Sequence, residues 1–151
     1  MRYCSVSDVL SVLRIFADDW DDFQQTIPTG LIEQIIDEDS LFVRNRLQSR
    51  YDINKIEALD PLPYTIRECT KLRASLTALD RIGVVSTERN QQIQQMLMNN
   101  YTDWLNMLKQ GNLFDNDGNL LAMNNRARVQ YQTSNNLETI KDIYKRGCHH
   151  V

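Results

Sequence analysis

The longest helical pattern in the chain covers residues 31–51, LIEQIIDEDSLFVRNRLQSRY. Its large apolar residues recur every three or four positions, the spacing that places side chains on one face of a helix. They are Leu31, Ile32, Ile35, Ile36, Phe42, Val43, Leu47 and Tyr51. The pattern predicts an amphipathic helix of about 20 residues that starts after Thr29, a suitable N-cap, and buries one wide face.

A shorter helix is predicted upstream of this segment. Ser5-Val6-Ser7-Asp8 resembles a capping box with Asp in place of Glu, and apolar residues follow at helical spacing as far as Phe16. The acidic run Asp18-Asp19-Trp20-Asp21-Asp22 should stop this helix, because Asp favours caps and turns over helix interiors. We therefore expect an acidic connector between the first two helices.

Two more helices are predicted downstream. The third follows a Pro-x-Pro connector, with Thr65 as its cap, and ends at Gly83. The fourth starts after Ser86 or Thr87 and ends at Gly111, another favourable C-terminal cap. Its first turn, residues 89–92, is polar on all sides and is expected to face water.

The composition changes after Gly111. Residues 1–111 carry more acidic than basic side chains, whereas residues 112–151 are nearly balanced and rich in Asn and Gln. We predict a four-helix body over 1–111 and an extended arm over 112–151. Deleting the arm is expected to leave the body folded.

The arm contains two recognisable patterns. Asp115-Asn116-Asp117-Gly118 lies between apolar pairs and predicts a short hairpin, since its spacing fails the calcium-loop motif. Residues 137–145 predict a terminal helix with Ile140, Ile143 and Tyr144 on one side.

The overall composition describes one mainly α domain. The 151 residues are 42% hydrophobic and 25% charged, and only 5 Gly and 3 Pro are present, too few turn residues for a sandwich or barrel. No apolar run approaches the roughly 20 residues that span a bilayer, and the N-terminus lacks a signal-peptide layout. Cys4, Cys69 and Cys148 are odd in number and widely spaced, which indicates reduced thiols.

Residue types that carry catalysis are scarce. The two histidines, His149 and His150, stand at the end of the chain, and no Gly-rich loop is present to hold a phosphate. Paired carboxylates such as Asp37 and Asp39 are expected to be solvated. Cys148 beside the histidines would need another element to complete a metal site. We predict no enzyme, metal site or cofactor.

A second class of function is a small helical DNA-binding or regulatory protein. Arg44, Arg46 and Arg50 lie in one predicted helix, and Arg126 and Arg128 lie close to an aromatic residue in the arm. Such clusters contact phosphates and stack on bases. The formal net charge of −3 and the acidic residues in the same helix favour a mixed-charge face or subunit contacts instead. Steep salt dependence of DNA affinity would distinguish this class.

Four short patterns follow one another along residues 1–111. They are Tyr3-x-Ser5-x-x-Asp8-Val9-Leu10, then Leu47-x-x-Arg50-Tyr51, then Pro61-x-Pro63 with Ile66 opening the next helix, and Tyr101-x-x-Trp104-Leu105 before Gly111. In this order and spacing the chain resembles the head–tail connector proteins of tailed bacteriophages, also called adaptor or head-completion proteins. It departs from them in a longer, more acidic segment 18–29 and in the length of its arm.

The resemblance implies a non-catalytic helical protein that assembles as a ring, typically of twelve copies, under the portal at the capsid vertex. Such a ring extends the DNA channel, lets the genome pass without specific binding, and docks the next tail component. Its location is the virion neck, after assembly in the host cytoplasm.

We place the contacts of this ring in two regions. The subunit-contact candidates share a mixed-charge helix face; they are Glu33, Asp37, Glu38, Arg44, Arg46 and Arg50. The candidates for docking the portal or a neighbour share the arm; they are Arg126, Arg128, Val129, Tyr131, Ile140, Ile143 and Tyr144.

Overall fold

A computed structural model describes residues 1–84, 86–111, 113–121 and 123. The predicted mainly α class is confirmed, because this part of the chain consists of helices, turns and two isolated β-bridges. The elements in order are α1 (Val6–Leu13), the 3₁₀ turn η1 (Arg14–Phe16), α2 (Trp20–Thr26), α3 (Leu31–Gln48), α4 (Ile53–Glu57), α5 (Tyr64–Ile82) and α6 (Glu88–Gln110). The four predicted helices correspond to α1, α3, α5 and α6.

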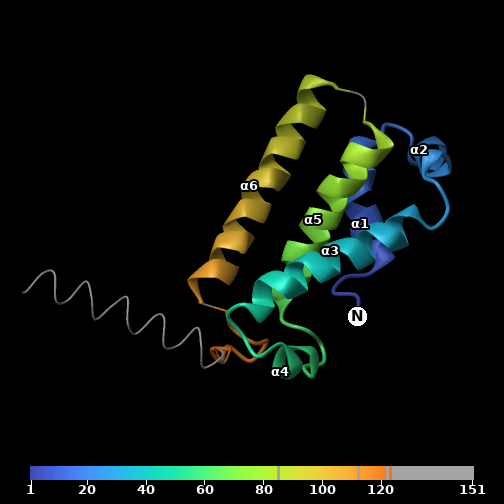
Figure 1. Ribbon diagram of the computed structural model, residues 1–151. Helices are drawn as coiled ribbons and strands as arrows, with labels where there is room; N and C mark the ends of the chain where they lie inside the picture. The colour runs from blue at the N-terminus through green and yellow to red at the C-terminus, as the bar shows by residue number, and fades with distance from the viewer. Residues whose placement is uncertain (85, 112, 122, 124–151) are drawn as a thin grey trace, which may run out of the picture.

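The central helix of the bundle is α5, which packs against α1, α3 and α6 (Figure 1). Three small residues of α5, Ala74, Ser75 and Ala78, are fully buried. Small side chains let helix backbones approach closely. Within the described residues, no helix is both long enough and apolar enough to cross a membrane.

The core has two parts along α5. One part joins α1, η1, the first half of α3 and the second half of α5, around Leu13, Ile35 and Ile36. The other joins the end of α3, α4 and the N-terminal residues, around Tyr3 and Leu47. Together they bury most of the apolar face predicted for residues 31–51, whereas Met96, on the apolar stripe expected for the fourth helix, is 52% exposed.

Two short helices occupy segments that were expected to be connectors. The acidic run was expected to lie between helices, but α2 begins inside it at Trp20. The Asp19 carboxylate accepts hydrogen bonds from the backbone N–H groups of Asp21 and Asp22, at 3.0 and 3.2 Å. Acidic residues are favourable in the first turn, so this run starts a helix rather than only ending one. The other short helix, α4, buries Ile53 and Ile56.

The predicted hairpin is present as a tight turn. Phe114 and Leu120 form an antiparallel bridge, and the Asp115 carboxylate accepts from the N–H groups of Asp117 and Asn119, at 2.9 and 2.8 Å. Leu113 and Leu121 are buried in the same cluster as Tyr51. The packed body therefore continues past Gly111, the residue at which the composition changes.

The caps of the long helices partly match the prediction. Gly83 and Gly111 do end α5 and α6, and Thr87 caps α6. In contrast, the N-cap of α3 is Gly30 rather than the predicted Thr29, and Thr65 lies inside α5 instead of capping it. The Asn116 side chain accepts from the Tyr64 N–H at 3.2 Å, so a residue 52 positions away caps α5. A tertiary cap of this kind leaves no local sequence signal.

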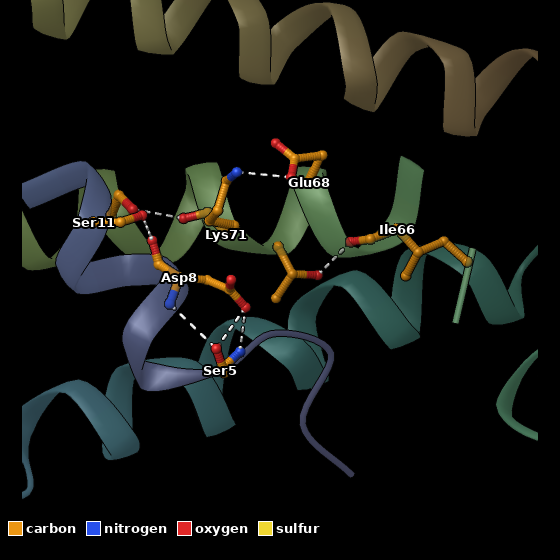
Figure 2. Close-up of polar contacts among 8 residues, drawn as sticks. Ser5, Asp8, Ser11, Ile66, Glu68 and Lys71 are labelled. Carbon is orange, nitrogen blue, oxygen red and sulfur yellow. Dashed lines mark hydrogen bonds and ion pairs between the residues drawn. The ribbon is translucent and has the colours of Figure 1, made fainter. Parts of the chain in front are cut away.

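The capping box of α1 is confirmed. The Ser5 hydroxyl accepts from the Asp8 N–H at 3.2 Å, and the Asp8 carboxylate accepts from the Ser5 N–H at 2.9 Å (Figure 2). The hydrogen bonds from the Ser5 side chain and backbone lower the pKa of Asp8 below its ordinary value of 3.8. The ionised carboxylate is therefore the form that stabilises the folded state.

Replacing Asp8 with alanine should destabilise the protein by about 1 kcal/mol at neutral pH. Because the pKa of Asp8 is lower when folded, its contribution is present above the unfolded pKa and is lost as pH falls through the folded pKa. The difference in melting temperature between wild type and Asp8→Ala should therefore shrink in acid. Thermal unfolding across the acid range checks this, and a constant difference would contradict it.

Candidate interaction surface

The predicted subunit-contact residues of α3 mostly bind partners within the same chain. Asp37 accepts two hydrogen bonds from Arg2, at 2.7 and 2.9 Å, and Glu38 pairs with Arg81. Hydrogen bonds from the Gln34 amide and from Arg81 lower the pKa of Glu38. These pairs tie the N-terminus and α5 to α3, so the carboxylates have a structural role before any role between subunits.

The remaining contact candidates do not form one basic patch. Arg44 donates to Glu57 at 2.9 Å, whereas the Arg46 guanidinium lies 5.2 Å from the centre of the Phe42 ring. Residues two positions apart on an α-helix are separated by about 200° around its axis, so Arg44 and Arg46 point to different sides of α3. Glu33 and Arg50 are both half-buried. The DNA-binding alternative needs its arginines near one side of the helix, and Arg44 and Arg46 do not lie on one side.

A buried polar network on α3 was missed by the sequence analysis. Asp39 was expected to be solvated with Asp37, but it is only 4% exposed. Its carboxylate accepts from Arg73 Nε at 2.7 Å and from the Thr77 hydroxyl at 2.8 Å. Arg73 also donates to the Tyr101 hydroxyl at 3.1 Å. The network connects α3, α5 and α6.

A sequence signal for this network exists. Asp39 stands four residues after Ile35 and four before Val43, on the apolar face of α3. Arg73 stands four residues after Cys69 and three before Leu76, on the apolar face of α5. Opposite charges on the apolar faces of two helices predict a buried pair, because a lone buried charge is costly.

The N-terminal segment is held by a second polar cluster. Tyr3 is fully buried, its N–H donates to Ser40 at 3.0 Å, and its hydroxyl donates to Glu57 at 2.8 Å. Burial opposes ionisation of Glu57, but the hydrogen bonds from Arg44 and Tyr3 outweigh it and lower the pKa of the carboxyl. This cluster fixes α4 beneath α3.

The most exposed long element is α6. Of its 23 residues, Asn90, Leu97 and Leu108 are buried, whereas Met96 is 52% exposed and Met98 is 44% exposed. No charged residue occurs between Arg89 and Asp103. We use the term outer face of α6 for its exposed residues from Gln91 to Gln110. The amide side chains on this face are Gln91, Gln92, Gln94, Gln95, Asn99, Asn100, Asn106 and Gln110.

The amides of the outer face keep hydrogen-bonding capacity. The Gln95 amide donates to Asn99 at 3.0 Å along the helix, which uses one of its two N–H donors. Methionine is enriched and charge is depleted at the centres of protein interfaces. Neutralising phosphate charge, in contrast, needs Lys or Arg, which supply most of the affinity for nucleic acid. The outer face of α6 is therefore suited to contact protein rather than nucleic acid.

Few groups in the described residues suit catalysis. No cluster of three or more His, Cys, Asp or Glu side chains is placed to hold a metal ion within those residues. Cys4 and Cys69 are buried free thiols, and burial raises the pKa of each to about 12, which makes them poor nucleophiles. The arm candidates, Arg126 to Tyr144, and the Cys148-His149-His150 end lie outside the described residues.

No family model, curated protein or solved structure matches the chain. Function is therefore inferred from the residues and their geometry.

Proposed function

We propose that the protein is a structural, non-catalytic head–tail connector that forms a ring under a phage portal, extends the DNA channel and docks the next tail component. The observation that carries the proposal is the outer face of α6, a long surface of amides and exposed methionines on which the charged residues are Asp103 and Lys109. A ring needs one face of each subunit to meet a different face of the next, and such a surface suits that contact.

Several residues that carry the family resemblance pack in the core or hold helices together. Tyr3 holds α4, Leu47 and Tyr51 are buried, and Trp104 lies edge-on to Tyr64 with ring centres 6.1 Å apart. These roles support a shared body architecture. The portal as the partner follows from the resemblance.

The charge distribution supports a channel that DNA passes without sticking. Residues 1–111 carry more acidic than basic side chains, and the acidic groups Asp18, Asp19, Asp21 and Asp22 are all exposed. A wall without clustered Lys and Arg releases few counterions and holds DNA weakly. A basic lumen in an assembled ring would contradict this part of the proposal.

Light scattering of the purified chain, alone and mixed with the portal ring of the same virus, tests the proposal. We expect the portal to gain a stoichiometric ring of this chain. A chain that ignores the portal and instead shifts a DNA duplex in a salt-dependent manner would indicate the regulatory alternative.

A pair of matched variants tests the role of the outer face of α6. Met96→Glu places a charge on this face, whereas Leu41→Glu places one at an equally exposed apolar position on α3. Met96→Glu should abolish ring assembly on the portal without lowering the melting temperature, and Leu41→Glu should assemble normally. Equal effects of the two substitutions would show that α6 is not the contact.

A further inference from the structure

A cleft of about 630 Å³ opens beside α2, next to the loop that joins α5 to α6. Phe16, Phe23 and Val84 give it apolar walls. The helix at its edge, α2, has no buried residue and lies outside the main bundle (Figure 1). The cleft therefore has room for apolar side chains that the described part of the chain does not supply.

The edge of this cleft is acidic. Asp18 and Asp19 line it, and Asp21 and Asp22 follow in the first turn of α2. Arg89 is the basic lining residue; its guanidinium lies 3.9 Å from Asp18, and both side chains are well exposed. The surplus of carboxylates favours an occupant that brings cations next to its apolar side chains.

Residues 137–146, LETIKDIYKR, combine apolar side chains with three cations, Lys141, Lys145 and Arg146, against two carboxylates, Glu138 and Asp142. In the helix that the spacing predicts, Leu137, Ile140 and Tyr144 share one face, and Lys141 and Lys145 border it. We propose that the cleft binds this segment from a second copy of the chain. The apolar side chains would enter the cleft, and the lysines would meet the carboxylates at its edge.

The reach of the chain favours a second copy over the same one. The described chain ends at Met123, which bridges Tyr51 and lies beside Gly111 at the end of α6. The cleft is lined by Thr87 and Asn90 at the opposite end of α6, about 34 Å away along a helix of 23 residues. Residues 124–136 span at most about 45 Å when fully extended and roughly 20 Å when relaxed, so binding within one chain would stretch the linker to about three-quarters of its full length.

This contact deepens the proposed function, because it would join neighbouring subunits of the ring. It rests on the proposed function, which supplies the further copies of the chain. Its test uses the free full-length chain without portal. Failure of the contact and failure of the portal proposal are therefore separate results.

Cross-linking between two differently labelled chains tests the contact. One chain carries Ala17→Cys in the cleft, the other carries Thr139→Cys beside the apolar face of the segment, and both carry Cys148→Ser. The buried Cys4 and Cys69 thiols, with the pKa of each raised to about 12, should stay unreactive. A short bismaleimide should link the two chains, and a control with Asn106→Cys in place of Ala17→Cys should give little product.

A charge exchange provides the matched control. Asp18→Lys on the cleft chain, or Lys141→Glu on the segment chain, should each lower the yield about fivefold, and the two together should restore it. Asp18 is fully exposed, so its replacement should leave the fold intact. Three results would overturn the proposal: yields no higher than the Asn106→Cys control, no restoration by the paired exchange, or a link formed only within one chain that carries both cysteines.

Discussion

Replacing Asp39 with alanine should destabilise the protein by about 3 kcal/mol, because removing one partner of a buried ion pair leaves the other charge uncompensated. The substitution removes the acceptor for Arg73 at 2.7 Å and for Thr77 at 2.8 Å. Arg73 would keep its position over the Phe42 ring, 3.5 Å from the ring centre, and its bond to Tyr101. In a chain of this size the loss corresponds to a fall of about 6–12 °C in melting temperature.

The matched control lies two residues earlier on the same helix. Asp37 also binds an arginine with two hydrogen bonds, but both side chains of that pair are about half exposed. Solvent screens such a pair, so Asp37→Ala should lower the stability much less than Asp39→Ala does. Thermal and denaturant unfolding of both variants checks the contrast. Equal stability losses would show that the buried network contributes no more than a surface pair.

The difference between Asp37 and Asp39 also shows what the sequence can predict. Periodicity identified α1, α3, α5 and α6, because each contributes a continuous apolar face to the core. It missed α2 and α4, whose 7 and 5 residues are too few to establish a period. The acidic composition around Asp37 and Asp39 suggested that both are solvated. Their burial depends instead on the face of the helix that each one occupies.

The polar contacts were harder to predict than the helices. Arg2 with Asp37 and Tyr3 with Glu57 join residues 35 and 54 positions apart, and their pairing follows from the way the helices pack. The mixed charges of α3 suggested contacts between subunits, but most of them are satisfied within the chain. The uncharged run from Asn90 to Thr102 is visible in the sequence, but the packing of α6 on α5 decides which of its residues are exposed.

The position at which the compact body ends should have a large effect on the stability of truncated chains. The change in composition places it at Gly111, but Leu113 is fully buried and Leu121 is 9% exposed in the core around Tyr51. The same turn caps α5, since the Asn116 side chain accepts from the Tyr64 N–H and donates to the Pro61 carbonyl at 2.9 Å. Residues 113–123 should therefore be required for the stability of the helices before them.

Two truncated chains test whether residues 113–123 stabilise the helices before them. A chain ending at Gly111 should be less stable than one ending at Met123 by about 3 kcal/mol, or about 10 °C in melting temperature, because it loses two buried leucines and the cap of α5. The entropy recovered by deleting the turn offsets part of the packing loss. Leu113→Ala in the full chain should reproduce about 2–4 kcal/mol of destabilisation. If the two truncated chains unfold at the same temperature, the turn adds nothing to the core, and the body ends at Gly111 as the composition suggests.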